Sequence, residues 1–260
     1  MIITEEKAQI VTITIDGKKI ECQAGEYLLD VAARNGIIIP SLCRHEGLPG
    51  QGCCRICIVE VETGARRDIV TSCIYPVGQD CIVYTDSDAV RQNRRIVLAL
   101  LRSRVPESEV VGHFCKEYDV PEFGRFSPRD DTGACILCGL CVKACEKLGT
   151  GAISTVNRGI DKKVSTPYDE PSLVCVGCAS CASVCPTGAI DVYEDESSRV
   201  IWNKKFPLAR CKRCGVVIGT AFEIRRAARR IDSDPPELCE KCRRLAMTDV
   251  IADTYSQLNT

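Results

Sequence analysis

The order of hydrophobic and polar residues predicts two strands and a helix near the N-terminus. Hydrophobic residues alternate with polar ones over 9–23, and Asp16-Gly17 between the two halves favours a type I′ turn, so we expect a β-hairpin. A helix is expected from about Glu26 to Asn35, ended by Gly36 in a left-handed conformation. Ile37 to Ile39 predict a short buried strand. This order of elements is typical of the opening of a β-grasp fold.

Two further helices and a linker are expected along the rest of the chain. Asp86 or Ser87 would cap a helix that reaches about Arg104. Residues 116–134 are rich in proline, glycine and charge and predict a linker. The capping box from Thr220 to Glu223 opens a helix that ends near Ile231. The solvated face of the earlier helix is expected to contain Arg91, Arg94 and Arg95.

Composition indicates a metal-binding protein. The chain has 20 cysteines among 260 residues, and most of them cluster as C-x2-C units. Neither a signal peptide nor an apolar run of membrane-spanning length is visible, so we expect no direct membrane insertion. A reducing cytoplasm, where thiolates stay available for metals, fits this pattern. The net charge of −1 gives no reason to expect nucleic acid as a partner.

Two cysteine runs in the middle of the chain repeat one spacing. C-I-L-C-G-L-C-V-K-A-C occupies 135–145, and C-V-G-C-A-S-C-A-S-V-C-P occupies 175–186. The spacing C-x2-C-x2-C-x3-C is the ligand pattern of two-cluster bacterial ferredoxins, in which the last cysteine of each run binds the other cluster. Structural zinc sites or disulfides are the alternatives, although zinc sites normally use two C-x2-C pairs. The predicted ligands are Cys135, Cys138, Cys141 and Cys185 for the first [4Fe-4S] cluster, and Cys145, Cys175, Cys178 and Cys181 for the second.

The segment between the two runs supports an internal duplication. The tetrapeptide T-G-A-I occurs at 150–153 and again at 187–190. The 29 residues between Cys145 and Cys175 are expected to form a β-excursion, whose stretch A-I-S-T-V-N-R-G would pack beside the first cluster.

Four more cysteines surround a glycine-rich loop that follows the predicted β-grasp opening. They are Cys43, Cys54, Cys57 and Cys73. Small residues let backbone N–H groups approach sulfur, which suits a [2Fe-2S] cluster, and a single zinc site is the alternative. Cys54 completes a C-x2-C unit and is preferred over its neighbour Cys53. His45 beside this loop is expected at the surface.

The run I-P-S-L-C-R-H-E-G-L-P-G-Q-G-C-C-R-I-C-I-V-E-V-E resembles the N-terminal [2Fe-2S] domain of the large iron–sulfur subunit of complex I. It is equally similar to the small diaphorase subunit of NAD-reducing nickel–iron hydrogenases and to the N-terminus of iron-only hydrogenases. The resemblance covers roughly residues 8–195 and implies that Cys43, Cys54, Cys57 and Cys73 are ligands. It also implies a partner subunit that handles NAD(P)H with a flavin, and a low-potential catalytic partner such as a hydrogenase or formate dehydrogenase, with electron bifurcation as one option.

The chain departs from these relatives after the helix that ends near Arg104. Relatives usually place an extra cubane there, with ligands spaced His-x3-Cys-x2-Cys-x5-Cys, but this chain offers only His113 and Cys115. We therefore expect that the fourth cluster is absent and that these two residues are structural. The route of electrons between the [2Fe-2S] site and the cubanes stays open at this point.

Two C-x2-C pairs near the C-terminus form a second kind of site. Cys211, Cys214, Cys239 and Cys242 suit a tetrahedral structural zinc, with a third [4Fe-4S] cluster or a redox disulfide pair as alternatives. The helix between the pairs carries a basic face, either solvated or docked on an acidic partner subunit. That face contains Arg225, Arg226, Arg229 and Arg230. Four cysteines are left over and are expected to be buried small hydrophobes, namely Cys22, Cys53, Cys81 and Cys115.

The sequence therefore predicts an α+β protein that holds redox centres. No dinucleotide fingerprint, P-loop or Ser/His/Asp arrangement occurs, and two histidines leave little scope for acid–base catalysis. We expect an electron-transfer subunit without a substrate site of its own, in a larger cytoplasmic oxidoreductase. A free-standing multi-cluster ferredoxin-like carrier and an iron–sulfur redox sensor are the alternatives, and soluble ferredoxin is a further candidate partner.

Four segments are expected along the chain. Residues 1–84 would form the β-grasp [2Fe-2S] domain, and residues 85–130 a helix and linker. Residues 131–200 would form a two-[4Fe-4S] ferredoxin-like domain, and residues 201–260 a small helical four-cysteine module that resembles a zinc ribbon.

Overall fold

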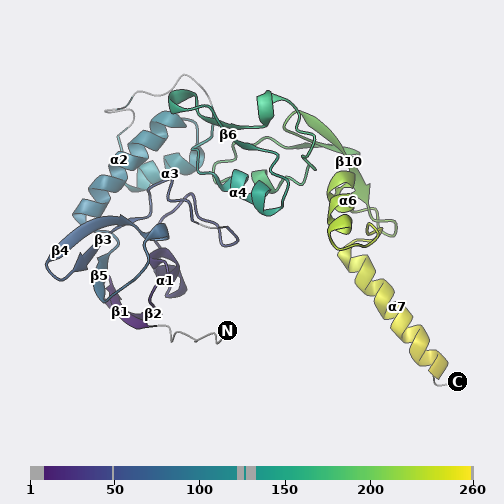
Figure 1. Ribbon diagram of the computed structural model, residues 1–260, viewed down its shortest axis with the longest axis horizontal. Helices are drawn as coiled ribbons and strands as arrows, with labels where there is room; N and C mark the ends of the chain where they lie inside the picture. Colours follow the sequence, from purple (N-terminus) through teal and green to yellow (C-terminus); the bar gives the residue numbers. More distant parts are fainter. Residues whose placement is uncertain (1–8, 49, 122–125, 127–132, 259–260) are drawn as a thin grey trace, which may run out of the picture. The chain divides into compact units, whose positions relative to one another are not determined.

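The computed structural model describes residues 9–48, 50–121, 126 and 133–258 (Figure 1). The chain divides into two compact units that both draw on its middle third. The first unit contains Met1–Lys143, Asn157–Val164 and Val184–Ala189. The second unit contains Ala144–Val156, Ser165–Ser183 and Ile190–Thr260. None of the described helices is both long and apolar enough to cross a lipid bilayer.

A five-stranded sheet forms the core of the first unit, in the order β2-β1-β5-β3-β4. Strands β1 and β5 are parallel, and the other neighbours are antiparallel. The hydrophobic side chains of β1 and β2 alternate between buried and exposed, and they pack with helix α1 (Leu28–Arg34) in one core. The β-grasp prediction is confirmed. The strands are β1 (Ile10–Ile15), β2 (Lys18–Gln23), β3 (Ile58–Thr63), β4 (Arg66–Thr71) and β5 (Cys81–Tyr84).

The predicted turns of this unit are present, but one predicted strand is not. Asp16 and Gly17 both have positive φ, at 47° and 84°, as a type I′ turn requires. Gly36 follows α1 with φ 75°, as expected of the residue that ends a helix. The strand predicted over 37–39 is wrong, because this segment lies outside the sheet and leaves Ile38 91% exposed. An apolar run in the sequence does not show whether a neighbouring strand is available to form hydrogen bonds with it.

Two helices follow the sheet. Ser87 caps α2 (Asp88–Arg104), since its hydroxyl accepts a hydrogen bond from the Val90 N–H at 3.3 Å. The sequence did not predict α3 (Glu109–Glu117), which ends inside the expected linker; most of the rest of that linker lies outside the described residues. Within α3, His113 is exposed and Cys115 is buried, so the two side chains do not converge on one site.

The middle of the chain contains short elements. The predicted β-excursion between the two cysteine runs is present as two three-residue strands. The helices and strands of this stretch are α4 (Leu140–Lys147), β6 (Ser154–Val156), β7 (Lys163–Ser165) and α5 (Ser180–Ser183). The short 3₁₀ turns of the described residues are η1 (Ser72–Ile74), η2 (Gly159–Asp161) and η3 (Pro167–Asp169).

The second unit contains an antiparallel sheet in the order β11-β10-β9-β8, where the sequence suggested a helical module. Phe206 of β10 is fully buried and meets Phe222 edge to face, with ring centroids 5.7 Å apart. The predicted capping box is confirmed: the Thr220 hydroxyl accepts from the Glu223 N–H, and the Glu223 carboxylate accepts from the Thr220 N–H. The elements are β8 (Tyr193–Glu194), β9 (Ser198–Ile201), β10 (Lys204–Arg210), β11 (Val217–Thr220), α6 (Ala221–Arg230) and α7 (Glu240–Leu258).

Arg94 is buried, so its assignment to the solvated face of α2 was wrong. Its side chain is 1% exposed and donates to the carbonyls of Ile56 and Ile58 at 3.0 and 2.8 Å. It also donates to the Tyr118 hydroxyl at 2.8 Å. A guanidinium can be buried when carbonyls accept from nearly every N–H. Because Ile56 lies between two predicted cluster ligands, Arg94 joins α2 to the loop that carries them.

We expect Arg94→Lys to lower the free energy of unfolding of the first unit by about 3 kcal/mol, because one ammonium cannot replace several charge-assisted hydrogen bonds. The measurement is urea unfolding followed by circular dichroism, with visible absorbance to monitor the 54–57 loop. Tyr118→Phe is the matched control and should cost about 1 kcal/mol, since it removes one of these bonds. Equal stability of wild type and Arg94→Lys would contradict the role assigned to Arg94.

Candidate metal centres

The first candidate centre brings together four thiols from three loops of the first unit. Cys43 follows α1, Cys54 and Cys57 precede β3, and Cys73 lies in η1. All four side chains are at most 2% exposed. Hydrogen bonds link Cys43 to Cys54 and to Cys73, and Cys57 to Cys73. The structure therefore gathers the four residues that the sequence selected.

The protonation of these thiols depends on their neighbours. Hydrogen bonds from Cys54 and Cys73 lower the pKa of the Cys43 thiol to about 2. The hydrogen bond from Cys73 lowers the pKa of Cys57 to about 6. The same bonds, together with burial, raise the pKa values of Cys54 and Cys73. Such a set of sulfurs, partly ionised and shielded from water, has the donor chemistry of an iron–sulfur site.

Cys54, and not Cys53, belongs to this group. Cys53 is exposed and its Sγ faces the Gln51 carbonyl at 3.5 Å, whereas Cys54 is 2% exposed. Cys53 is therefore not the buried residue that the sequence suggested; the other three left-over cysteines are buried. His45 is exposed and accepts from the Gly47 N–H at 3.1 Å, so it closes a turn at the surface.

Gly50 and Gly52 of this loop lie so close to neighbouring atoms that a larger residue would not fit. A Cβ on Gly50 would lie 2.8 Å from the Cys73 carbonyl oxygen, and one on Gly52 would lie 2.9 Å from the Ile74 side chain. Backbone N–H groups reach the sulfurs: Leu42 donates to Cys54 at 3.4 Å, and Cys54 donates to Cys43 at 3.5 Å. N–H donors of this kind stabilise the more negative, reduced state of an iron–sulfur cluster.

The two central cysteine runs adopt the same loop conformation. The second and fourth residues after the first cysteine have positive φ in both, at Leu137 and Gly139 in one and at Gly177 and Ala179 in the other. Leu137 and Ala179 are not glycines, so these loops are held in a conformation that L-residues rarely adopt. Turns of this kind direct successive N–H groups into a concavity that binds anions and cluster sulfurs.

The first central site lies wholly within the first unit and consists of Cys135, Cys138, Cys141 and Cys185. Burial raises the pKa of Cys138 to about 11 and that of Cys141 to about 12, and charge at Cys135 and Cys185 acts on both in the same direction. The Leu137 N–H donates to Cys135 at 3.4 Å. Cys185, which comes from the second run, therefore lies with the three leading cysteines of the first run, as the sequence predicted.

The second central site lies wholly within the second unit, and its four thiols line one cavity. Cys145, from the end of the first run, joins the three leading cysteines of the second run. Burial and charge at Cys145 and Cys178 raise the pKa of Cys181, while the Trp202 indole N–H donates to Cys181 at 3.5 Å. These four thiols, of which Cys181 is buried and the other three are partly buried, and their N–H donors fit a [4Fe-4S] cluster.

The T-G-A-I repeats have matching roles at the last cysteine of each run. The Ala152 N–H donates to Cys145 at 3.2 Å, and the Ala189 N–H donates to Cys185 at 3.2 Å. Ala152 and Ile153 also line the cavity of the second site, so the prediction that the segment 152–159 packs beside the first cluster is wrong for its first half, which remains with Cys145. Asn157 of the same segment lines a cavity with Cys135 of the first site, as predicted.

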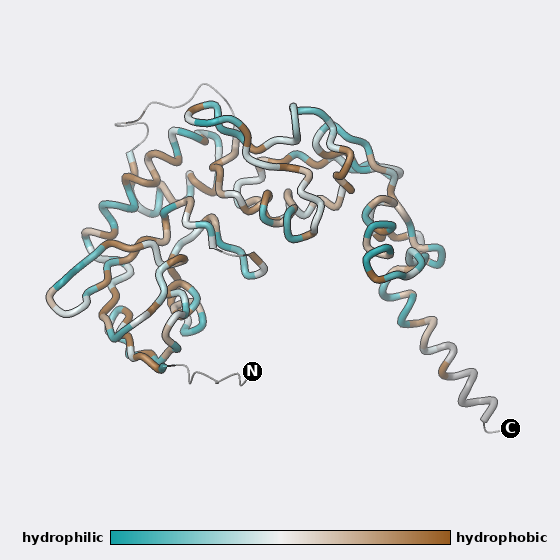
Figure 2. The backbone as a smooth tube through the Cα atoms, in the orientation of Figure 1, coloured by the Kyte–Doolittle hydropathy of each residue, from teal (hydrophilic) through white to brown (hydrophobic). Residues whose placement is uncertain are grey.

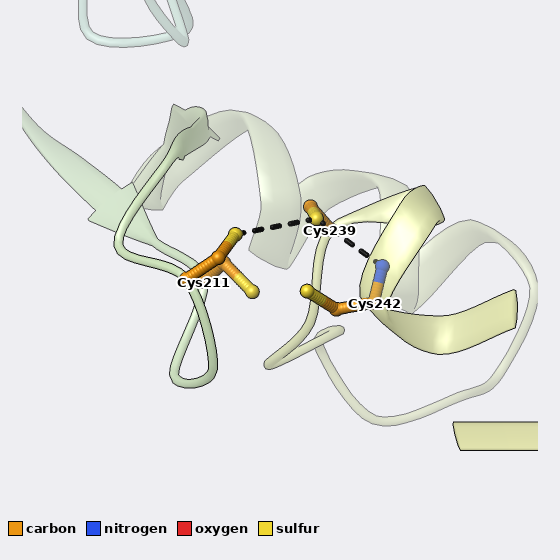
Figure 3. Close-up of side chains that lie close together, drawn as sticks. Cys211, Cys239 and Cys242 are labelled. Atoms are coloured by element: carbon orange, nitrogen blue, oxygen red, sulfur yellow. Dashed lines mark hydrogen bonds between the residues drawn. The ribbon is translucent and has the colours of Figure 1, made fainter. Parts of the chain in front are cut away.

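The C-terminal site is more compact than the others. The four Sγ atoms of Cys211, Cys214, Cys239 and Cys242 all lie within 4.8 Å of one another, and those of Cys214 and Cys239 are 3.7 Å apart. Figure 3 shows Cys211 facing Cys239 and Cys242 across the site. The first pair lies between β10 and β11, and Cys242 lies in the first turn of α7. Backbone N–H groups, that of Cys239 above all, outweigh burial and lower the pKa of Cys211 to about 6.

Comparison with known proteins identifies the iron–sulfur domains. Residues 8–88 match the family described as 2Fe-2S iron-sulfur cluster binding domain, and residues 134–189 match the family described as 4Fe-4S dicluster domain. These matches cover the first candidate centre and both central sites. They do not extend to the C-terminal four-cysteine site.

Relatives along the chain are subunits of larger enzymes. NADP-reducing hydrogenase subunit HndD of Solidesulfovibrio fructosivorans is 35% identical over 84% of this chain and 41% of its own length. The mitochondrial NADH-ubiquinone oxidoreductase 78 kDa subunit of Candida albicans is 28% identical over 69% of this chain and 28% of its own length. The chain thus spans less than half the length of these curated relatives.

A solved structure has the same fold over much of the chain. It is the crystal structure of an NAD+-reducing [NiFe]-hydrogenase in the H2-reduced state, with a TM-score of 0.57 and 27% identity. The match covers 69% of this chain and 86% of the matched chain.

We expect Gly177→Ala to empty the second central site and leave the others intact. A Cβ at Gly177 would lie 2.5 Å from the buried Phe206 ring, and φ at this position is +72°. Iron analysis should show a loss of about four irons per chain, and EPR the loss of one [4Fe-4S] signal. Gly139→Ala is the matched control: φ is similar, at +79°, but the nearest atom is the end of the Gln51 side chain at 3.4 Å. Full iron content in Gly177→Ala would contradict the packing described.

Proposed function

This chain contains a 2Fe-2S iron-sulfur cluster binding domain followed by a 4Fe-4S dicluster domain, and on that premise we propose that it is the electron-transfer subunit of a larger NAD(P)-linked oxidoreductase. It would relay electrons between a flavin-containing subunit that handles NAD(P)H and a low-potential catalytic subunit, such as a hydrogenase or formate dehydrogenase. The observation that carries this proposal is the presence of three separate four-thiol sites, one buried and two partly buried, in a chain whose relatives are hydrogenase and NADH-ubiquinone oxidoreductase subunits.

The three sites would hold one [2Fe-2S] and two [4Fe-4S] clusters. The ligands would be Cys43, Cys54, Cys57 and Cys73 for the first; Cys135, Cys138, Cys141 and Cys185 for the second; and Cys145, Cys175, Cys178 and Cys181 for the third. A bound cluster of either type exchanges single electrons at low potential. The chain's own residues exclude water from the sulfurs and donate backbone N–H groups to them, which sets the potential of each site.

The packing of the first unit supports direct passage of electrons from the [2Fe-2S] site to the first cubane. The charge at Cys43 acts on Cys138, so ligands of the two sites lie within electrostatic reach of one another. A Cβ on Gly139 of the cubane loop would lie 3.4 Å from the Gln51 side chain of the [2Fe-2S] loop. The cluster that relatives hold with an extra histidine is therefore not needed to connect these two sites.

We assign the C-terminal site to a structural zinc ion. Four sulfurs at about 2.3 Å from one Zn²⁺ form a tetrahedron with edges of about 3.8 Å, and the Cys214 and Cys239 sulfurs are 3.7 Å apart. In a cubane the four thiolates bind four different irons and spread further apart, as in the two central sites, whose sulfurs do not form such a compact group. The geometry favours zinc over the [4Fe-4S] alternative.

Metal analysis and reoxidation of the anaerobically purified protein test the proposed function. We expect about ten irons and one zinc per chain, and the reduced protein should deliver about three electrons to an excess of ferricyanide, one from each cluster. Clusters that cannot be reduced and reoxidised would refute the electron-transfer role. Size-exclusion chromatography of native extract separates a subunit from a free carrier, because only a carrier would elute near 28.5 kDa.

We expect Cys242→Ser to remove the zinc and leave the iron content at about ten per chain, because loss of one of four ligands removes much of the binding free energy of a structural zinc site. The measurement is elemental analysis by mass spectrometry. Cys53→Ser is the control, since that thiol lies outside every site, and it should change neither metal. A loss of about four irons in Cys242→Ser, with no zinc in the wild type, would replace the zinc with a third cubane.

A further inference from the structure

A groove of about 750 Å³ in the second unit lies beside the second cubane site. One wall is helix α6, and the other is the loop that leads into Cys175. The Cys175 ligand is itself part of the lining, so whatever occupies the groove comes next to that site. The groove has an apolar part and a basic part, lined by Leu173, Val174, Arg225, Arg226, Arg229 and Arg230.

The arginines of α6 lie next to one another and have no carboxylate partner among the described residues. They occupy positions i, i+1, i+4 and i+5 of the helix, which lie side by side, and Figure 2 shows α6 as largely hydrophilic. In the described part of the chain, no ion pair involves any of the four. No carboxylate of the described residues therefore neutralises the positive charge of this face.

Two of the arginines anchor the helix, and two are free to bind. Arg226 donates to the Gly149 carbonyl, and Arg230 donates to the Leu148 carbonyl at 3.1 Å. Arg225 and Arg229 are exposed. Arg225 bonds to its own helix at the Ala221 carbonyl and lies over the Phe222 ring, with its guanidinium carbon 5.1 Å from the ring centre.

The apolar side of the groove is presented to solvent by a fixed loop. Leu173 is 93% exposed and Val174 is 52% exposed. The Lys204 ammonium holds the loop by donating to the carbonyls of Ser172 at 2.8 Å and Cys175 at 3.2 Å. Exposed apolar residues beside arginines and an aromatic ring are the usual composition of a protein-binding surface.

We propose that this groove docks an acidic redox protein, whose one-electron centre exchanges an electron with the cluster held by Cys145, Cys175, Cys178 and Cys181. The inference rests on the proposed function. Unpaired arginines attract an acidic partner and speed its approach, and the exposed apolar residues lose their water when it docks. Because Cys175 lines the groove, the docked partner is also placed where electron transfer is fast. In the step itself the reduced cluster loses one electron and the partner's centre gains it.

Two forms of one haem protein serve as probes. Native cytochrome c is basic, and succinylated cytochrome c has the same haem with its lysines converted to acids. Stopped-flow absorbance would give the rate at which the reduced chain reduces each, and calorimetry with the oxidised chain would give Kd values. The variant is Arg225→Gln with Arg229→Gln, which spares the two anchoring arginines. The control is Arg66→Gln with Arg67→Gln on β4 of the first unit, which removes the same charge elsewhere.

At low ionic strength, the Arg225/Arg229 variant should reduce succinylated cytochrome c about tenfold more slowly than wild type and bind it correspondingly more weakly. The control should match wild type, and native cytochrome c should show no loss with either variant. At about 1 M salt, where the Debye length is about 3 Å, the difference between variant and wild type should vanish. Equal losses in the variant and the control would overturn the docking surface.

Failure of this inference is distinct from failure of the proposed function. If all variants deliver their electrons to ferricyanide but bind both cytochromes alike, the relay stands and the docking surface is refuted. If no variant delivers electrons, the relay itself is refuted. Tight binding of a 20-nucleotide DNA strand that only the Arg225/Arg229 variant loses, without any effect on succinylated cytochrome c, would assign the groove to nucleic acid instead.

Discussion

Thiolates held close together repel one another, and much of this protein's structure depends on a metal ion or cluster to offset that repulsion. The first unit has an apolar core of its own, in which the sheet packs against α1. The second unit has much less: Phe206, Ile201 and Ile224 are among its few buried large side chains. Small domains with little core rely on metal binding for their stability. The cysteines of the second unit would therefore support its fold as well as its proposed redox role.

The backbone around the sulfurs connects folding with function. Left-handed turns at Leu137 and Ala179 are strained for L-residues, and they persist because the surrounding loop holds them. The same turns aim N–H groups at cluster ligands, and those N–H groups adjust the affinity for an added electron. Thr220 also has two roles. Its hydroxyl accepts from the Glu223 N–H in the capping box of α6 and donates to the Val176 carbonyl in the loop after Cys175. The groove beside α6 is thereby tied to the second cubane site.

Spacing along the sequence predicted which cysteines lie together better than periodicity predicted the helices and strands. The spacing between cysteines reflects the geometry of the cluster that they bind. The sequence alone therefore predicted that Cys185 lies with the first run and Cys145 with the second. Burial of Arg94 could not, because its carbonyl acceptors come from residues 56 and 58, far along the chain. The sheet formed by β8 to β11 was also missed, since its strands are short and partly charged. The contacts of Trp202 with Cys181 and of Thr150 with Cys145 could not be predicted either, because a single hydrogen-bond partner of a sulfur has no pattern in sequence.

The crossing of ligands between the two cysteine runs has a consequence for biosynthesis. Neither central site has all its thiols until the ribosome reaches the second run: one is complete at Cys181, and the other must wait for Cys185, the last cysteine of that run. The two ring closures are nested, because the span from Cys145 to Cys175 lies inside the span from Cys141 to Cys185, so the site of the first run is the last to close. Until Cys181 is made, up to six of the eight thiols are present without a complete set of four. Their protection from oxygen then depends on the cell's delivery of clusters keeping pace with translation.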